Sequence, residues 1–198
     1  MTELNRQVQL RSRPGGIPQA EHFEVIETPL GLLPDGKFRV RNVYLSVDPA
    51  MRGWVSTTTN YSSPVRIGEA MWSFAVGEVV ESRHPDYSVG EHLVGMFGWQ
   101  IFAESDGQNV IRRVREHDLP LSAQLGVLGL NGITAYFALL SIGEPKPGET
   151  VLVSTAAGSV GSAVGQIAKI MGCRAVGITG GPDKVLAAVK IRVLMALT

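Results

Sequence analysis

The pattern of hydrophobic and polar residues divides the chain into two regions that meet near residue 118. In the first region, apolar and polar positions alternate over residues 38–44, and further apolar stretches occupy 75–80 and 93–102. Gly, Asp and Pro turns separate these stretches. Short strands with such turns indicate a compact all-β unit of barrel-like form. We therefore expect a β domain over residues 1–120.

In the second region, residues 121–198, the period is helical at first. Two apolar stretches, 122–130 and 134–142, are typical of helices that are split by Asn131-Gly132. The prolines of the following turn, Pro145 and Pro147, forbid helix continuation. These two stretches are the expected linking helices.

A strand–helix–strand pattern follows the proline turn. An apolar strand is expected at 151–155, and a helix with an apolar stripe at Val160, Val164, Ile167 and Met171 comes next. Gly172 predicts the end of that helix, and 174–179 is the second strand. This order indicates the first part of a doubly wound parallel sheet, so the fold class is a β domain followed by an α/β domain.

The most specific motif lies between the first strand and the helix: Ala156-Ala157-Gly158-Ser159-Val160-Gly161. It is GxGxxG with alanine at the first glycine. A small first residue permits the tight turn, Gly158 lets the backbone approach phosphates, and Gly161 lets the helix sit close to the strand. Free N–H groups and the helix dipole would hold a dinucleotide's pyrophosphate. The alternative is a packing turn that binds no ligand.

The end of the second strand bears on which dinucleotide would bind. Sites that prefer NAD place an acidic residue there for the ribose hydroxyls. Here the residues are Ile178-Thr179-Gly180-Gly181, and the first acid is Asp183. A 2′-phosphate would be tolerated, and Lys184 is well placed to pair with it, so NADP(H) is preferred over NAD. The alternative for Lys184 is a solvated lysine in the first turn of a helix.

Composition and charge exclude several classes of function. Lys plus Arg equal Asp plus Glu at 18 each, so no global field attracts nucleic acid or an anionic membrane. The apolar stretch 125–142 is interrupted by glycines and is short for a membrane span. Cys173 is the only cysteine, which excludes an internal disulfide and favours a cytoplasmic location. The polar N-terminus has no signal-peptide pattern.

The remaining polar side chains suggest no second kind of chemistry. No G-x-S-x-G motif is present, and Ser154 and Ser159 either donate to phosphate or close the turn. The cluster Arg112-Arg113-Val114-Arg115 is interpreted as a solvated strand end. The histidines are scattered, whereas a catalytic metal needs clustered ligands, so no metal site is expected. They are His22, His84, His92 and His117.

Several separate motifs together resemble the medium-chain dehydrogenase/reductase superfamily. Within it the chain is most similar to the zinc-independent, NADPH-dependent alkenal reductases, also called prostaglandin reductase-like enzymes. The resemblance covers roughly residues 5–184. The motifs are Tyr44–Gly53, Gly77–Ser82, Gly98-Trp99, Leu125–Phe137, Lys146–Val153 and Ala156–Lys169.

The resemblance implies a GroES-like β domain followed by a Rossmann domain. It also implies hydride transfer from NADPH to the β-carbon of an α,β-unsaturated aldehyde or ketone, without zinc, with protonation of the enolate. Full-length members are expected to be homodimers. Asn131 and Thr134 would lie near the nicotinamide end of the cofactor. The residues implied on the side of the small-molecule substrate are Asp48, Ala50, Met51, Arg52 and Tyr61.

The sequence departs from the family pattern in three places. Ala50 stands where the family usually has tyrosine, which widens the substrate pocket. Asn131 replaces a common proline and either bonds the cofactor's carboxamide or caps a helix. Residues 185–198 no longer resemble the family, and the tyrosine often assigned as proton donor would lie beyond residue 198, so no catalytic residue is assigned.

The unfamiliar residues 185–198 suggest a truncated chain and leave two alternatives to alkenal reduction. One is a non-catalytic product that at most binds a nucleotide or a partner chain, because the first strand of the sheet would lack a neighbour on one side. The other is a quinone reductase of the same superfamily.

Overall fold

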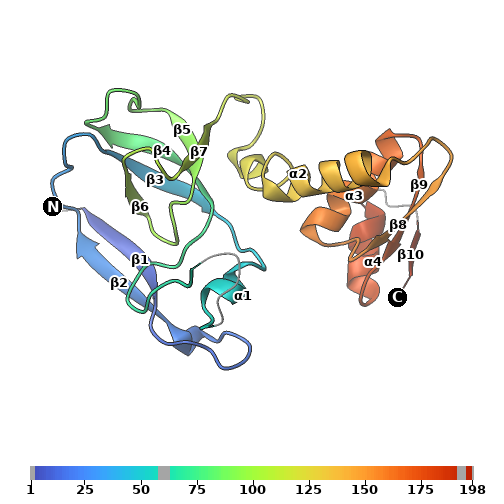
Figure 1. The fold of residues 1–198 in the computed structure, drawn as a ribbon, viewed down its shortest axis with the longest axis horizontal. Coiled ribbons are helices and arrows are strands. Elements are labelled where there is room, and N and C mark those ends of the chain that lie inside the picture. Colours follow the sequence, from blue (N-terminus) through green and yellow to red (C-terminus); the bar gives the residue numbers. More distant parts are fainter. Residues whose placement is uncertain (1–2, 58–62, 191–194, 198) are drawn as a thin grey trace. The chain divides into compact units, whose positions relative to one another are not determined.

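The computed structural model describes residues 3–57, 63–190 and the backbone of 195–197. The chain divides into two compact units, Met1–Leu125 and Gly126–Thr198, and Figure 1 shows their elements. The first unit is built mainly of strands. Its elements are β1 (Leu4–Leu10), η1 (Ala20–His22), β2 (Phe23–Pro29), β3 (Phe38–Leu45), α1 (Met51–Trp54), β4 (Ala75–Ser82), β5 (His92–Gly95), β6 (Phe102–Ser105), β7 (Val110–Arg113) and η2 (Leu121–Gln124).

Antiparallel pairing organises the first unit. Five strands form one sheet in the order β6-β3-β4-β5-β7, and β1 pairs with β2 in a separate ribbon. Two isolated bridges, Gln7↔Gln100 and Gln9↔Ala70, join β1 to the segments that precede β6 and β4. The predicted all-β unit is therefore confirmed.

The core of the first unit follows from the alternation along β3. Phe38 and Val40 are fully buried, and they pack with Val79, Leu93 and Phe97 from β4, β5 and the segment after β5. Because successive side chains of a strand point to opposite faces, alternating apolar positions bury one face of the sheet.

The predicted single strand over 93–102 is wrong at its centre. β5 ends at Gly95 and β6 begins at Phe102. A Cβ on Gly95 would come within 2.5 Å of the Phe97 ring, and Gly98 has a φ of +72°. The chain therefore turns between the two strands, because the backbone at Gly98 takes a left-handed conformation that ends an extended strand.

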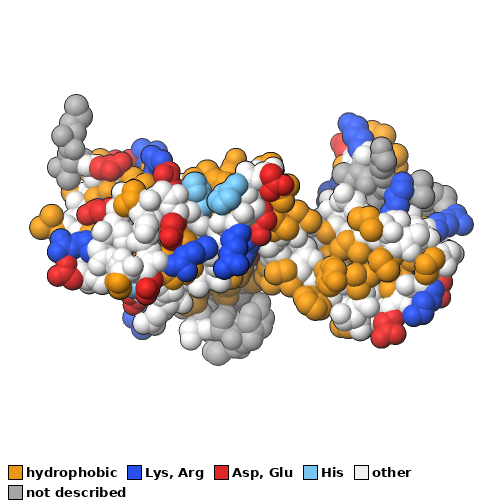
Figure 2. Space-filling model, turned by 90° about the horizontal axis from the view of Figure 1, so that it is seen from above, with side chains coloured by type: hydrophobic (Ala, Val, Ile, Leu, Met, Phe, Trp, Pro, Cys, Tyr) orange, Lys and Arg blue, Asp and Glu red, His pale blue; other side chains and the backbone are white. Residues whose placement is uncertain are grey.

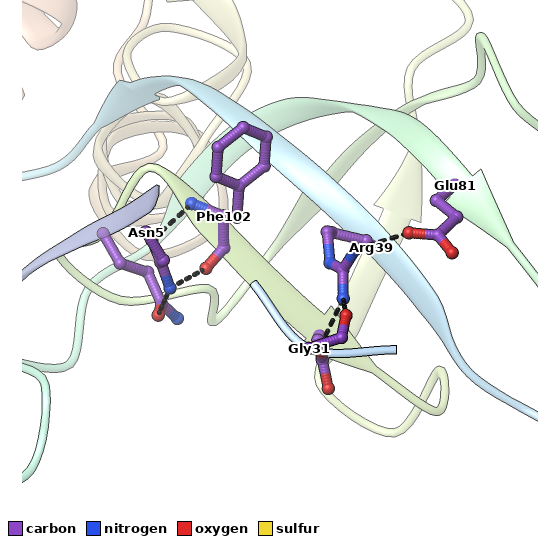
Figure 3. A network of polar contacts seen from close by, with 7 residues as sticks. Asn5, Gly31, Arg39, Glu81 and Phe102 are labelled. Carbon is purple, nitrogen blue, oxygen red and sulfur yellow. Dashed lines mark hydrogen bonds and ion pairs between the residues drawn. The ribbon is translucent and has the colours of Figure 1, made fainter. Parts of the chain in front are cut away.

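Buried polar side chains fasten the ribbon and the sheet to each other (Figure 3). The Asn5 amide of β1 donates to the Phe102 carbonyl at 2.8 Å and accepts from the Phe102 N–H at 2.9 Å, as a strand neighbour would. Arg39 is 5% exposed, and its guanidinium donates to the Gly31 carbonyl at 2.8 Å and pairs with Glu81 and Glu104. The Asn5 amide and the two terminal nitrogens of Arg39 are tolerated inside because they are hydrogen-bonded, whereas the Arg39 Nε has no partner among the described residues.

The second unit begins an α/β sheet. Its elements are α2 (Leu130–Phe137), the π-helical turn η3 (Ala138–Gly143), β8 (Thr150–Ser154), α3 (Ser159–Ile170), β9 (Arg174–Ile178), α4 (Pro182–Lys190) and β10 (Met195–Leu197). The strands are parallel, in the order β10-β9-β8. This is the start of a Rossmann sheet, so the predicted fold class is confirmed.

The predicted split of the linking helices at Asn131-Gly132 is wrong. Helix α2 runs through both residues, while the preceding stretch forms only the short η2 and a turn. A Cβ on Gly132 would lie 1.8 Å from the Val127 carbonyl oxygen. The glycine is therefore a position of close backbone approach inside a helix rather than a helix breaker.

The predicted end of helix α3 is confirmed in detail. Gly172 has a φ of +77°, its N–H donates to the Lys169 carbonyl, and the Cys173 N–H donates to the Ala168 carbonyl at 2.9 Å. This is a Schellman motif, in which a left-handed residue satisfies the last carbonyls of the helix. The buried face of α3 consists of small residues, while Met171 from the predicted stripe is 37% exposed.

Candidate functional site

The turn between β8 and α3 is a tight reversal that glycines make possible. The Gly158 N–H donates to the Thr155 carbonyl at 2.8 Å. A Cβ on Gly161 would lie 2.4 Å from the same carbonyl oxygen, and one on Gly158 would lie 3.0 Å from it. The last glycine therefore lets α3 start directly against the strand, which is the role that the motif predicts for it.

The beginning of α3 offers unused hydrogen-bond donors. Among the described residues, none accepts a hydrogen bond from the N–H of Ala157, Ser159, Val160 or Gly161. The N-cap residue is Gly158, so no side chain caps the helix. The first N–H groups of a helix lack partners within the helix and carry the positive end of its dipole. The turn can therefore hold an anionic group by its main chain.

The end of β9 lies beside this turn. Ser154 and Ile178, the last residues of the two parallel strands, are register partners, and the Ala156 N–H donates to the Ile178 carbonyl at 3.0 Å. Thr179 is 6% exposed, and no atom lies within 4 Å of the position of a Cβ on Gly180. The predicted residues Thr179 and Gly180 thus share one edge of the sheet with the glycine turn.

Lys184 stands in the first turn of α4, which begins at Pro182. Its side chain is exposed and forms no ion pair with a carboxylate of the described residues. A cation at a helix N-terminus opposes the helix dipole, at a cost of about 0.3–1 kcal/mol. This position is consistent with a lysine that serves an external anion.

The predicted residues Asn131 and Thr134 lie on α2, which packs along α3. Thr134 is exposed, and its hydroxyl donates to the Leu130 carbonyl of its own helix at 2.7 Å. Asn131 is half-buried. The cap residue of α2 is Gly129, and no side chain caps the helix, so the interpretation of Asn131 as a helix cap is wrong.

The predicted substrate-side segment forms a compact turn in the first unit. The Ser46 hydroxyl donates to the Asp48 carboxylate at 2.5 Å, and the Met51 N–H donates to the Asp48 carbonyl at 3.0 Å. Ala50 is half-buried and Arg52 is exposed, whereas Met51 is 7% exposed and belongs to the apolar core. Tyr61 lies outside the described residues.

An aromatic cluster surrounds this segment, and sequence reasoning missed it. The Trp54 and Trp72 rings are 6.1 Å apart, and the Trp99 ring lies 5.9 Å from Phe23. The Trp99 indole donates to the Ser46 carbonyl at 3.1 Å. The tryptophans are far apart in sequence, so no local pattern could have revealed that they share one core cluster.

The part of the chain that the structure describes contains no group of three or more His, Cys, Asp or Glu side chains suited to a metal ion. His84 lies in the first unit against Phe38 and Tyr87, with ring centroids 5.9 and 5.0 Å away.

Within the same described residues, no helix combines the length and apolar character of a membrane span.

Known proteins resemble this chain in sequence and fold. The family model for the N-terminal domain of oxidoreductases matches residues 6–112. The NADPH-dependent curcumin reductase of Escherichia coli is 46% identical over 92% of this chain and 52% of its own length. Prostaglandin reductase 1 of Oryctolagus cuniculus is 43% identical over 86% of this chain and 47% of its own length. The chain spans about half the length of the curated relatives it matches.

A solved structure matches both units. It is that of CurA from Vibrio vulnificus in complex with NADPH, with 41% identity and a TM-score of 0.87 over 97% of this chain and 57% of that one. These matches point to the same family as the glycine turn and the β domain with its Asp48–Gly53 segment. The chain belongs to the oxidoreductase family whose N-terminal domain matches residues 6–112, within the zinc-independent branch of the medium-chain dehydrogenases/reductases.

Proposed function

We propose that this chain binds NADP(H) at the β8–α3 turn. The observation that carries the proposal is the set of unused N–H groups on Ala157, Ser159, Val160 and Gly161. They accompany Gly158 and Gly161, where a Cβ would crowd the Thr155 carbonyl oxygen, so that glycine permits the tight turn from which these N–H groups project. Such a helix N-terminus is suited to a pyrophosphate. The NADPH complex of the related CurA supports the choice of this cofactor.

Lys184 supports NADP(H) over NAD(H). It is an exposed cation at a helix end where a cation is electrostatically unfavourable, and it stands at the edge of the sheet where β9 ends. Thr179-Gly180-Gly181 precedes it and offers no carboxylate for the ribose hydroxyls. In this proposal Lys184 neutralises the 2′-phosphate, and the dipole penalty disappears when the anion binds.

The proposed reaction is reduction of the C=C bond of α,β-unsaturated aldehydes or ketones, in the cytoplasm and without zinc. Bound NADPH supplies the hydride. Relatives named as curcumin reductase, prostaglandin reductase and 2-alkenal reductase support this substrate class. The segment Asp48–Arg52 is the proposed substrate side, where Ala50 leaves more room than a tyrosine. Asn131 is half-buried, and its amide is the proposed partner of the nicotinamide carboxamide.

The cofactor proposal is tested by Lys184→Ala. Fluorescence titration should show that NADPH binds more tightly than NADH to the unaltered protein. A hydrogen bond to a charged group contributes about 1.5–3 kcal/mol, so the substitution should weaken NADPH binding by roughly 10- to 100-fold and leave NADH binding unchanged. Lys190→Ala, at the other end of α4, is the matched control. Equal affinities for NADPH in all three proteins would refute the assignment of Lys184.

A second candidate function is a non-catalytic chain that binds nucleotide or a partner chain. The outer edge of β8 has no strand partner among the described residues, and Leu152 on that strand is 63% exposed. An unpaired apolar strand favours pairing with another chain. Light scattering and a 2-alkenal assay separate the candidates: a monodisperse protein that turns over alkenals excludes the non-catalytic one. Turnover of quinones but not alkenals would favour a quinone reductase.

A further inference from the structure

Ser46 is held at three points where β3 ends. Its N–H donates to the Phe74 carbonyl at 2.8 Å, and its carbonyl accepts the Trp99 indole N–H at 3.1 Å. Its hydroxyl donates to the Asp48 carboxylate at 2.5 Å. Segments distant in the sequence therefore fix the main chain of Ser46, and the Ser46 side chain fixes the direction of the Asp48 carboxylate.

The Asp48 carboxylate is not what holds its own turn together. The main-chain carbonyl of Asp48, rather than its side chain, accepts the Met51 N–H at 3.0 Å. The N-cap residue of the short helix α1 is Ala50, and no side chain caps this helix. Asparagine favours such turns as aspartate does. The turn therefore does not account for a negative charge at this position.

The Asp48 carboxylate also has hydrogen-bonding capacity that the protein leaves unused. Asp48 is half-buried, and an ionised carboxylate offers about four acceptor sites. Within residues 3–57 and 63–190, the Ser46 hydroxyl is its one donor, and no cationic side chain, Arg52 of the same turn included, forms an ion pair with it. A partly buried charge is normally compensated by hydrogen bonds or an opposite charge. A further donor from a bound molecule would therefore be favourable.

We propose that Asp48 is a specificity-determining residue that accepts a hydrogen bond from a hydroxyl group of the substrate. This inference rests on the proposed function, in which Asp48–Arg52 is the substrate side. It narrows the substrate class to enones that carry a hydroxyl group away from the C=C bond. Ala50, in the same turn, supplies no hydroxyl of its own. Ser46 is a positioning residue that acts by orienting the carboxylate.

Matched ligands isolate the contribution of the hydroxyl group. Each α,β-unsaturated methyl ketone from 3-penten-2-one to 3-octen-2-one is compared with its derivative that carries a terminal hydroxyl, and with the methyl ether of that alcohol, which cannot donate. Binding is measured by isothermal titration calorimetry with NADP+ present, so that no hydride is transferred. We expect the alcohol of best-fitting length to bind roughly 10-fold more tightly than its methyl ether, as one hydrogen bond to a charged, partly solvated acceptor allows.

Variants of the two residues then test the assignment. Asp48→Asn, which keeps the shape and removes the charge, should reduce this preference to roughly 2-fold and leave the affinity for the parent ketone unchanged. Ser46→Ala should weaken the preference, because the carboxylate loses its orientation, whereas Ser46→Thr keeps the hydroxyl and should retain it. Asp118→Asn, at an exposed aspartate without an ion pair to any described cation, is the matched control. A purely structural role would change the affinity for all ligands alike.

The outcomes separate this inference from the proposed function. If the ketones bind but no alcohol binds more tightly than its methyl ether, or if Asp48→Asn keeps the full preference, the inference is wrong and the proposed function stands. If thermal melting shows that Asp48→Asn is unfolded, Ser46→Ala and Ser46→Thr are compared instead, and equal preferences in these two proteins would refute the contact. If the unaltered protein binds none of the ketones, the proposed function fails and the inference fails with it.

Discussion

The two units of the chain bury different kinds of side chains. The largest fully buried residues all belong to the first unit, among them Phe38, Phe97, Leu10 and Met71. The core cluster of the second unit is built mostly of small residues. Its members are Leu139, Val153, Ala156, Ala168, Cys173, Ala175 and Ala188. The first unit thus fills its interior with side chains, whereas the second brings backbones close together.

The units also differ in what they leave exposed. In Figure 2, hydrophobic side chains gather on the second unit. The first unit shows charged side chains of both signs between its own hydrophobic ones. On α2, Ile133, Tyr136 and Phe137 are each more than half exposed, and Leu152 on β8 is 63% exposed. Parallel sheets are normally covered on both faces. In the described part of the second unit, by contrast, apolar side chains of α2 and β8 are exposed.

The largest effect should come from the core of the first unit. Phe38 is fully buried with its ring 4.3 Å from that of Tyr87. Phe38→Ala should lower the free energy of unfolding by about 3–5 kcal/mol, because it removes apolar contacts and leaves a cavity. All tryptophans lie in this unit, so their fluorescence in a denaturant titration reports the change. Leu32→Ala, at a side chain that is 98% exposed, should change it by less than about 0.5 kcal/mol.

A Phe38→Ala variant as stable as the Leu32→Ala control would contradict this difference between the units, because the first unit would then not depend on large buried side chains.

A smaller effect is expected where the second unit packs backbone against backbone. Gly161→Ala would place a Cβ 2.4 Å from the Thr155 carbonyl oxygen, which cannot move without disturbing the turn. Overpacking of this kind costs about 1–3 kcal/mol. Faster hydrogen exchange in β8 and β9 would report it, while the tryptophan signal of the first unit keeps its midpoint. Gly180→Ala is the control, since its Cβ would meet no atom within 4 Å.

Equal exchange in the Gly161→Ala and Gly180→Ala proteins would show that close backbone packing does not hold the second unit together.

Local patterns predicted most of the site. The sequence predicts the glycine turn, the two strands beside it and the end of α3 at Gly172, because each of these features depends on residues close together in the chain. The expected preference for a 2′-phosphate, which stays a prediction, also depends on a short segment, Thr179–Lys184. These features reflect turn chemistry and hydrophobic period, which act over a few residues.

The features that the sequence did not reveal depend on contacts between distant or crowded groups. Gly132 looked like a helix breaker, because nothing local indicates that the Val127 carbonyl approaches it. The pairing of Trp54 with Trp72 arises only when the loops of the first unit fold together. The left-handed backbone of Thr155, with a φ of +52°, could not be predicted either, since threonine gives no signal for a positive φ.

The smallest effect is expected at a charged cluster on the surface of the first unit. The backbone N–H of Glu116, followed by Arg112 at 3.2 Å, lowers the pKa of the Glu116 carboxyl below its ordinary value of 4.5. A lowered pKa means that the folded state favours the carboxylate. Its contribution to stability is therefore present above the ordinary pKa and is lost as the pH falls through the lower, folded-state value.

Glu116→Gln should flatten the fall in melting temperature as the pH drops below the ordinary carboxyl pKa of 4.5, and leave the melting temperature at neutral pH nearly unchanged. Glu24→Gln, which removes an exposed carboxylate without an ion pair to any described cation, should keep the original slope. Raising the salt concentration should shrink the difference between the variants, because solvent screens exposed charges. If both variants show the same pH profile, the Glu116 carboxylate adds nothing to the stability of the first unit, and its lowered pKa has no measurable consequence.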